Sequence, residues 1–233
     1  MPASSGRHTG AKSLAGKHLA RMLRLVTLGR LDLTRDGVAV LPGRRKLLSV
    51  IAYLTRARGR LVSRSQLAAL FWPVEDEVRA RRSVRQALTD LRRAVGAALQ
   101  ERDDAVAITA DSIQLDASEL EAANAAGDYR RVIELWSGDF LADADDVGGE
   151  EFRGWLEPER QGLRSQFAFA TEKLADHAEH RGAWESGLVL TRAWIATSPY
   201  DERAHARHVR LLALAGHRIE AAAAGELHPT LTR

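Results

Sequence analysis

The chain alternates between short stretches with apolar residues at every second position and longer stretches with apolar residues at every third or fourth position. Residues 77–95 show the second pattern most clearly. Placed at about 100° per residue, their large apolar side chains form one stripe, typical of a helix that packs against a core. These residues are Val84, Leu88, Leu91 and Val95. We therefore predict a core-anchored helix over residues 77–95.

The opposite face of this helix is polar and basic. Its residues recur at spacings of three or four and are Arg79, Arg82, Gln86, Thr89 and Arg93, with Arg85 on the flank. Asp90 is the one acid between Arg79 and Arg93, and we expect it to project beside this row rather than within it. The exposed face is then strongly positive, as on a helix that lies on DNA. A solvated arginine face is the alternative, and the surrounding elements decide between them.

Two further helices precede this one. Ser63 to Gln66 form a capping box that opens a short helix, which Trp72-Pro73 closes. Before it, Leu47, Ile51 and Leu54 share the face of another helix that ends near Gly59. The order is therefore helix, helix, turn and arginine-rich helix.

Short strands are predicted on both sides of the helices. Residues 23–41 alternate in polarity around an Asp36-Gly37 turn, the pattern of antiparallel strands. Residues 106–115 alternate around Ala110 to Ser112, which predicts a tight β-hairpin. Strands, three helices and a hairpin make a compact N-terminal domain.

These elements and residues resemble the OmpR-like winged helix-turn-helix. RSVRQALTDLRR at residues 82–93 stands where that family has the form R-T-V-x-x-x-I-x-x-L-R-R in its recognition helix. Together with LPGRRKLLSVIAYL and VSRSQLAALFWP, it is similar to the variant found in SARP-type regulators, the antibiotic regulatory proteins. These join the winged helix to a bacterial transcriptional activator domain. The resemblance covers roughly residues 22–230.

The second half of the chain reads as an array of helices. Gly127, Gly182 and Gly216 each separate two helical patterns, and the last two are 34 residues apart, the tetratricopeptide period. A long helix is predicted from Glu151 to Arg181. The fold class that follows is mostly α with small β-sheets, in which a winged helix-turn-helix domain is followed by a tetratricopeptide-like α-helical domain.

Charge is divided between the two halves. Residues 1–115 contain 21 basic and 10 acidic residues, whereas residues 116–233 contain 13 and 21. A net charge of +11 beside one of −8 favours a nucleic-acid-binding half joined to a protein-interacting half. We assign residues 1–21 to a disordered basic tail, 22–115 to the DNA-binding domain and 116–233 to the activator domain. No long apolar run suggests a membrane partner, and the absence of cysteine fits the cytoplasm.

Catalytic and metal-binding patterns are weak. Residues 10–18 have the wrong spacing for a phosphate-binding loop, and the pairs His177/His180 and His205/His208 lack further ligands. Acidic pairs such as Asp145-Asp146 read as solvated charge. We expect no enzyme activity, catalytic residue, metal or cofactor.

The resemblance implies a sequence-specific transcriptional regulator, an activator that binds directly repeated promoter sites as a homodimer and recruits RNA polymerase. Arg82, Gln86 and Thr89 are the candidates for base contacts, since these side chains suit guanine, adenine and the thymine methyl group. The candidates for backbone contacts are Arg79, Arg85 and Arg93. The turn between the last two helices supplies the polymerase-contact candidates, which are Trp72, Glu75, Asp76 and Glu77. A tetratricopeptide-like scaffold or ligand sensor without specific DNA binding is the alternative.

Overall fold

The computed structural model describes residues 23–73 and 76–226 of the 233-residue chain. It divides into two compact units. The first contains the residues up to Val26 and Asp32–Leu115, and the second contains Thr27–Leu31 and the residues from Asp116 onward. The segment assigned to a disordered tail and the phosphate-loop look-alike at residues 10–18 lie outside the described residues.

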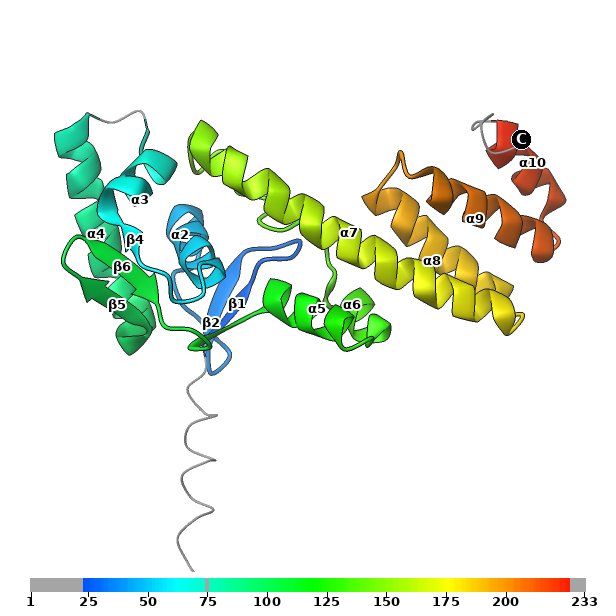
Figure 1. Cartoon of the computed structure of the whole chain (residues 1–233), viewed down its shortest axis with the longest axis horizontal. Coiled ribbons are helices and arrows are strands. Elements are labelled where there is room, and N and C mark those ends of the chain that lie inside the picture. Colours follow the sequence, from blue (N-terminus) through cyan, green and yellow to red (C-terminus); the bar gives the residue numbers. More distant parts are fainter. Residues whose placement is uncertain (1–22, 74–75, 227–233) are drawn as a thin grey trace, which may run out of the picture. The chain divides into compact units, whose positions relative to one another are not determined.

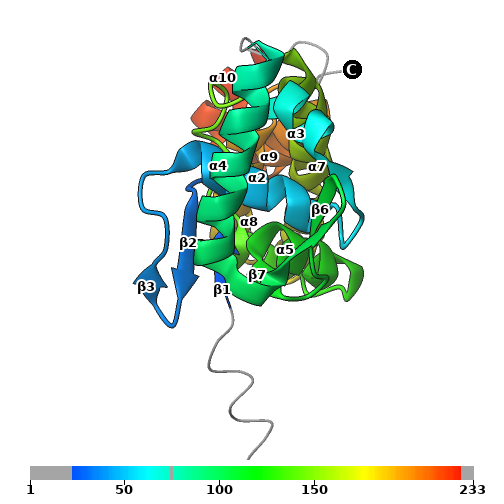
Figure 2. The same cartoon turned by 90° about the vertical axis from the view of Figure 1, so that its left-hand side faces the viewer.

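The first unit contains a four-stranded sheet. Its strands are β1 (Leu23–Val26), β2 (Asp32–Arg35), β3 (Val38–Ala39) and β7 (Ile113–Leu115), in the order β3-β2-β1-β7. The predicted turn joins β2 to β3, with positive φ at both Asp36 and Gly37, as a type I′ hairpin requires (Figure 2). β7 pairs with β1 in parallel, with Leu23 opposite Ile113. β7, which follows the helices in the sequence, therefore forms the edge of this sheet next to β1.

A second, three-stranded sheet carries the wing. Its strands are β4 (Val62–Ser63), β5 (Leu99–Arg102) and β6 (Ala105–Ile108), in the order β4-β6-β5. The β5–β6 hairpin turns at Asp103, whose φ is +48°. The hairpin expected over residues 106–115 is wrong, because β6 and β7 belong to different sheets. The backbone of β7 bonds to β1 instead, so Ala110 to Ser112 redirect the chain rather than fold it back.

Three helices complete the first unit. They are α2 (Arg45–Arg56), α3 (Arg64–Phe71) and α4 (Glu77–Val95). The predicted cap of α3 is present, since Ser63 Oγ accepts the backbone N–H of Gln66 at 3.1 Å. The Gln66 amide itself donates to the Tyr53 hydroxyl at 2.8 Å, which ties α3 to α2. α3, the turn after it and α4 form a helix-turn-helix.

The second unit is an array of helices (Figure 1). In chain order these are α5 (Asp116–Ala125), α6 (Tyr129–Leu135), α7 (Glu150–His180), α8 (Trp184–Thr197), α9 (Glu202–Leu214) and α10 (Arg218–Glu226). Gly127, Gly182 and Gly216 lie between successive helices with φ of +75°, +69° and +87°, as their sequence positions predict. α7 packs with α8, α8 with α9 and α9 with α10. This is the helical-hairpin arrangement expected of a tetratricopeptide-like array.

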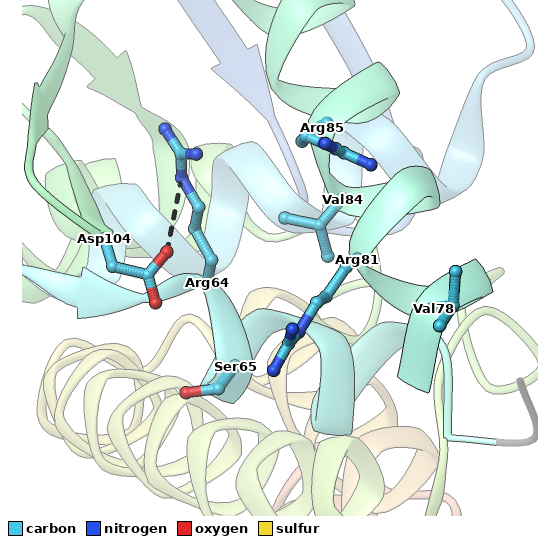
Figure 3. A pocket seen from close by; sticks show the side chains of 7 residues that line it. All are labelled: Arg64, Ser65, Val78, Arg81, Val84, Arg85 and Asp104. Carbon is cyan, nitrogen blue, oxygen red and sulfur yellow. Dashed lines mark ion pairs between the residues drawn. The ribbon is translucent and has the colours of Figure 1, made fainter. Parts of the chain in front are cut away.

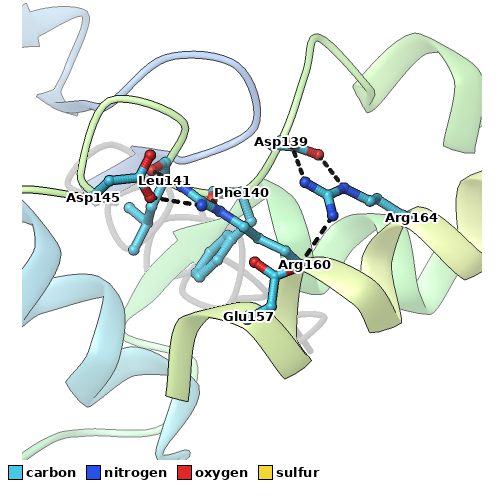
Figure 4. Close-up of polar contacts among 7 residues, drawn as sticks. All are labelled: Asp139, Phe140, Leu141, Asp145, Glu157, Arg160 and Arg164. Carbon is cyan, nitrogen blue, oxygen red and sulfur yellow. Dashed lines mark hydrogen bonds and ion pairs between the residues drawn. The ribbon is translucent and has the colours of Figure 1, made fainter. Parts of the chain in front are cut away.

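Two arginines of α7 hold the acidic loop that precedes this helix (Figure 4). The guanidinium of Arg160, buried to 9% exposure, donates to the carbonyls of Phe140 and Leu141 and to Asp145 Oδ1 at 2.7–2.8 Å. Arg164 forms a two-point ion pair with Asp139, and its hydrogen bond lowers the pKa of that carboxyl. Asp145 is exposed, as expected of a solvated acid, but it also forms an ion pair with a buried arginine, which the sequence did not predict.

Candidate nucleic-acid interface

α4 is fixed at both ends and along one face. Asp76 caps its N-terminus, with Oδ1 accepting the backbone N–H of Arg79 at 2.9 Å, and Gly96 ends it with a φ of +59°. The predicted apolar stripe is buried, because each of its members is at most 3% exposed: Val84, Leu88, Leu91 and Val95. The opposite face of the helix is therefore presented outward on a rigid support.

The exposed face is basic. α4 carries six arginines against the two acids Glu77 and Asp90. Within the described part of the chain, Arg82 and Arg85 are exposed and have no ion-pair partner, and they flank the exposed Gln86. Thr89 is half-buried, and its hydroxyl donates to the carbonyl of Arg85 at 3.0 Å, which leaves its methyl group as the contact available to a ligand.

Asp90 does not stand aside from the basic row as expected. Its Oδ1 accepts the Gln86 amide at 3.2 Å and lies 3.9 Å from Arg93 Nη1, and its Oδ2 pairs with Arg44 Nη2 at 3.1 Å. The helical wheel places its Cβ on the flank correctly. However, side chains three and four residues apart on a helix reach one another, so the carboxylate lies against the row. Arg79 also has a carboxylate partner, Asp76, at 3.2 Å.

A groove of about 570 Å³ runs beside the exposed face of α4 (Figure 3). The start of α3, one side of α4 and the wing turn line it, through Arg64, Ser65, Val78, Arg81, Val84, Arg85 and Asp104. Three of these residues are arginines, whereas Asp104 is the single acid and lies 4.0 Å from Arg64 Nε. Arg64 and Arg81 are not among the site residues predicted from the sequence. Arg81 lies four residues before Arg85 and therefore shares its side of the helix, and this spacing could have identified Arg81.

The base of the wing is tied to the helix-turn-helix through one carboxylate. Glu101 on β5 accepts Arg64 Nη2 at 3.0 Å with one oxygen and pairs with Arg92 of α4 through the other. These contacts connect β5, the start of α3 and the end of α4. Beyond them, Arg102 is exposed at the tip of the hairpin, followed by the turn residues Asp103 and Asp104. The wing therefore offers one basic side chain at its tip.

The turn between α3 and α4 holds the residues predicted to contact the polymerase. Trp72 is half-buried, with Lys46 Nζ 5.4 Å from its ring centroid. Asp76 is the cap of α4, and Glu77 pairs with Arg81 one helical turn later. Glu75 lies outside the described residues. Asp76 and Glu77 therefore interact with residues of the first turns of α4, and both remain exposed.

The histidine pairs of the second unit contact protein groups. Nδ1 of His180 lies 2.7 Å from the Asp176 carbonyl, and Nε2 of His205 lies 2.7 Å from the Pro199 carbonyl. His208 Nδ1 lies 2.7 Å from the Thr191 hydroxyl. Across the residues that the structure describes, no cluster of three or more His, Asp or Glu side chains could hold a metal ion. Nor does any helix in that part combine the length and apolar character needed to cross a membrane.

A helix-turn-helix with an outward basic helix and a β-hairpin after it defines the winged helix-turn-helix class. Residues 103–226 match the family described as the bacterial transcriptional activator domain. The chain belongs to this family of transcription regulators. With a winged helix before the activator domain, it has the organisation of a SARP-type transcriptional regulator.

A solved structure has the same fold. The chain is similar to Mycobacterium tuberculosis EmbR, determined in complex with a low-affinity phosphopeptide, with a TM-score of 0.68 and 21% sequence identity. The match covers 89% of this chain and 58% of that protein, so the chain spans less than two thirds of its length. No curated protein matches the sequence.

Proposed function

We propose that this protein is a sequence-specific transcriptional activator that inserts α4 into the major groove of DNA. The observation that carries the proposal is the pair of exposed arginines, Arg82 and Arg85, that flank Gln86 without an ion-pair partner among the described residues. Unpaired guanidinium groups on a rigid helix are free to bind phosphates and guanine edges. Arg79, Arg81 and Arg93 each have an acidic partner at the cap or on the helix, so Arg82 and Arg85 are the arginines of α4 most available to a ligand.

The roles divide by position on α4. Arg82, Gln86 and Thr89 contact base edges, and Arg79, Arg85 and Arg93 bind the phosphate backbone. The groove beside the helix supports this division, because Arg64, Arg81 and Arg85 converge on it where a DNA strand would flank α4. If 6 to 10 phosphates are neutralised, affinity falls by roughly 10³- to 10⁵-fold between ~50 and ~200 mM salt.

The experiment that tests this function is selection of genomic DNA fragments by the purified full chain at ~150 mM salt. The Arg82→Ala, Gln86→Ala double variant is compared with Arg153→Ala, which removes an exposed arginine from α7 in the other unit. We expect the wild-type protein and Arg153→Ala to enrich one motif that the double variant loses. Equal, motif-free retention by all three proteins would refute sequence-specific recognition.

The small footprint of one winged helix favours two copies on DNA, and the resemblance to SARP-type regulators implies that these bind direct repeats. Two copies on half-sites about one helical turn apart would give useful discrimination. Once the motif is known, inserting about 5 base pairs between the half-sites rotates one by half a turn. The second copy should then bind without cooperativity, whereas a chain that acts singly would be unaffected.

We propose that the turn between α3 and α4 contacts RNA polymerase. Asp76 and Glu77 are exposed there, and Glu75 and Trp72 belong to the same turn in sequence. An acidic surface suits a basic partner. Glu77→Lys is the test, since it leaves the Asp76 cap intact: transcription from the bound promoter should fall while DNA affinity does not. Unchanged transcription would exclude this surface.

A second candidate function rests on a groove in the helical unit. This groove, of about 700 Å³, lies among α6, α7 and α8, with Ile133, Leu174 and Leu190 in its lining. Arg130 and Arg181 also line it and have no ion-pair partner within the described ranges. The acid in the lining, Glu134, pairs with Arg131, so a largely apolar groove with two unpaired arginines fits an acidic peptide with apolar side chains.

A labelled ten-residue peptide of leucine and glutamate tests this second function. It should bind the full chain, and an Arg130→Ala, Arg181→Ala variant should lose the interaction. Equal binding by the two proteins would exclude the groove. Peptide binding without any selected DNA motif would favour the scaffold or sensor over the activator.

A further inference from the structure

The carboxylate of Asp90 lies against the row of α4 residues proposed to face DNA, where a negative charge opposes DNA binding. Its carboxylate is held at both oxygens. Oδ2 pairs with Arg44, the residue before α2, at 3.1 Å, and Oδ1 accepts a hydrogen of the Gln86 amide at 3.2 Å. With its side chain only 18% exposed, Asp90 is a fixed acceptor beside a residue proposed to read a base.

A carboxylate determines how the neighbouring amide is oriented. An ionised Asp only accepts hydrogen bonds, so the Gln86 atom that faces Asp90 must be Nε2, the amide nitrogen. One of its two hydrogens is then occupied. What remains for a ligand is Oε1, an acceptor, and one N–H, a donor.

This remaining pair matches adenine and not guanine. In the major groove adenine presents the N7 acceptor and the N6 donor, whereas guanine presents two acceptors, N7 and O6. A free glutamine amide has two hydrogens to offer to guanine. With one of them held by Asp90, a single N–H remains, so one of the two guanine acceptors faces either no donor or the Gln86 carbonyl oxygen, and guanine is disfavoured.

We propose that Asp90 is a specificity-determining residue that makes Gln86 select adenine over guanine by occupying one amide hydrogen. The inference rests on the proposed function, because it assumes that Gln86 faces a base. Asp90 acts through Gln86 and does not itself touch DNA. The negative charge of Asp90 weakens binding to every DNA sequence. Its contribution is the discrimination between adenine and guanine at one base pair.

Asp90→Ala and Asp90→Asn both remove the negative charge and the acceptor that orients Gln86. In Asp90→Asn the single side-chain oxygen faces Arg44, which only donates, so the amide nitrogen faces Gln86. Both changes should raise affinity for all duplexes, since an acid is lost from the surface, and both should admit guanine. Asp104→Asn is the control for charge, because it removes an exposed acid beside the same groove and leaves the contact between Asp90 and Gln86 in place.

The test measures binding of the full chain to its selected duplex and to a set with single A·T to G·C changes, at ~150 mM salt. The base pair read by Gln86 is the one whose preference Gln86→Ala abolishes. A bidentate contact discriminates by roughly 5- to 150-fold, so we expect this preference for adenine in the wild-type protein. Asp90→Ala and Asp90→Asn should both reduce it to within roughly threefold, whereas Asp104→Asn should retain it.

The possible outcomes distinguish a failure of the role proposed for Asp90 from a failure of the proposed DNA recognition. If no motif is selected, the proposed DNA recognition fails. If Gln86→Ala abolishes one preference and Asp90→Ala leaves it intact, DNA recognition stands and the role of Asp90 is refuted. If Gln86→Ala changes no preference, Gln86 reads no base and the role of Asp90 is equally refuted. In the Gln86→Ala background, Asp90→Ala should cause no further change in preference.

Discussion

The buried carboxylate of Asp116 accepts the backbone N–H of Thr27, a residue 89 positions earlier, at 2.8 Å. The same carboxylate accepts the Thr27 hydroxyl at 2.5 Å and the N–H of Leu28 at 2.9 Å. It also accepts the N–H of Ala117 at the start of α5. One side chain that is 3% exposed thus satisfies four donors and fixes the segment Thr27–Leu31 in the helical unit.

Asp116→Ala should therefore destabilise the protein strongly. The change leaves buried backbone donors without partners, each of which costs about 1–3 kcal/mol, so we expect a loss of roughly 3 kcal/mol or more in the free energy of unfolding. Thr27→Val, which keeps the N–H and removes the hydroxyl, should cost about 1 kcal/mol. Urea denaturation of both variants checks this. Equal losses would mean that the backbone donors contribute little.

Gly29 should tolerate no side chain. Its φ is +76°, and a Cβ atom would lie 2.4 Å from the Ser137 carbonyl oxygen. Gly37 has a similar φ of +78° with open space around it, so Gly37→Ala measures the backbone strain alone, about 1–2 kcal/mol. Gly29→Ala should cost clearly more, since the backbone near Ser137 must also move. Thermal unfolding compares the two, and matching losses would contradict the close approach.

His208 should make stability fall in mildly acidic solution. Burial, followed by the nearby charges of Arg192 and His205, lowers its pKa from 6.5. Between the lowered pKa and 6.5 the unfolded chain binds a proton that the folded chain does not, so stability decreases as pH falls through this window and levels off below it. His208→Asn should remove this part of the pH dependence of unfolding. The exposed His177 offers a control, because His177→Asn should leave it in place.

Arg85 should contribute to affinity through a phosphate. Arg85→Ala should weaken binding to all DNA sequences to a similar degree and lower the slope of log affinity against log salt by about 1. Fluorescence anisotropy over a salt series measures this. Arg153→Ala should leave the slope unchanged. A changed motif with an unchanged slope would instead place Arg85 on a base edge.

The helix-turn-helix could be predicted from the sequence because its signals are local. The periodicity of Val84, Leu88 and Leu91 defines the buried face of α4, and Asp76 and Gly96 mark its ends. The capping residue Ser63 and the helix-separating glycines act over three or four residues. Such features depend on neighbours that the sequence itself places together.

Strand pairing and side-chain partners could not be predicted in the same way. The strand at residues 113–115 alternates in polarity just as a hairpin strand does, and only its pairing with β1, at Leu23–Leu25, reveals a different sheet. Likewise, the partner of Asp90 that fixes its second oxygen is Arg44, 46 residues away. Contacts between distant segments depend on the assembled fold, so a helical wheel places Asp90 without showing what it binds.

The path of the chain between its two units bears on how relatives could exchange their parts. The backbone leaves the sheet after Val26, contributes Thr27–Leu31 to the helical unit, returns at Asp32 and leaves again after Leu115. A chimaera joined at one point after Leu115 would carry a foreign Thr27–Leu31 into a helical unit whose Asp116 and Ser137 fit the native one. Joining the DNA-binding unit of one relative to the helical unit of another therefore needs three crossovers. The segment Thr27–Leu31 must come from the same parent as the helices.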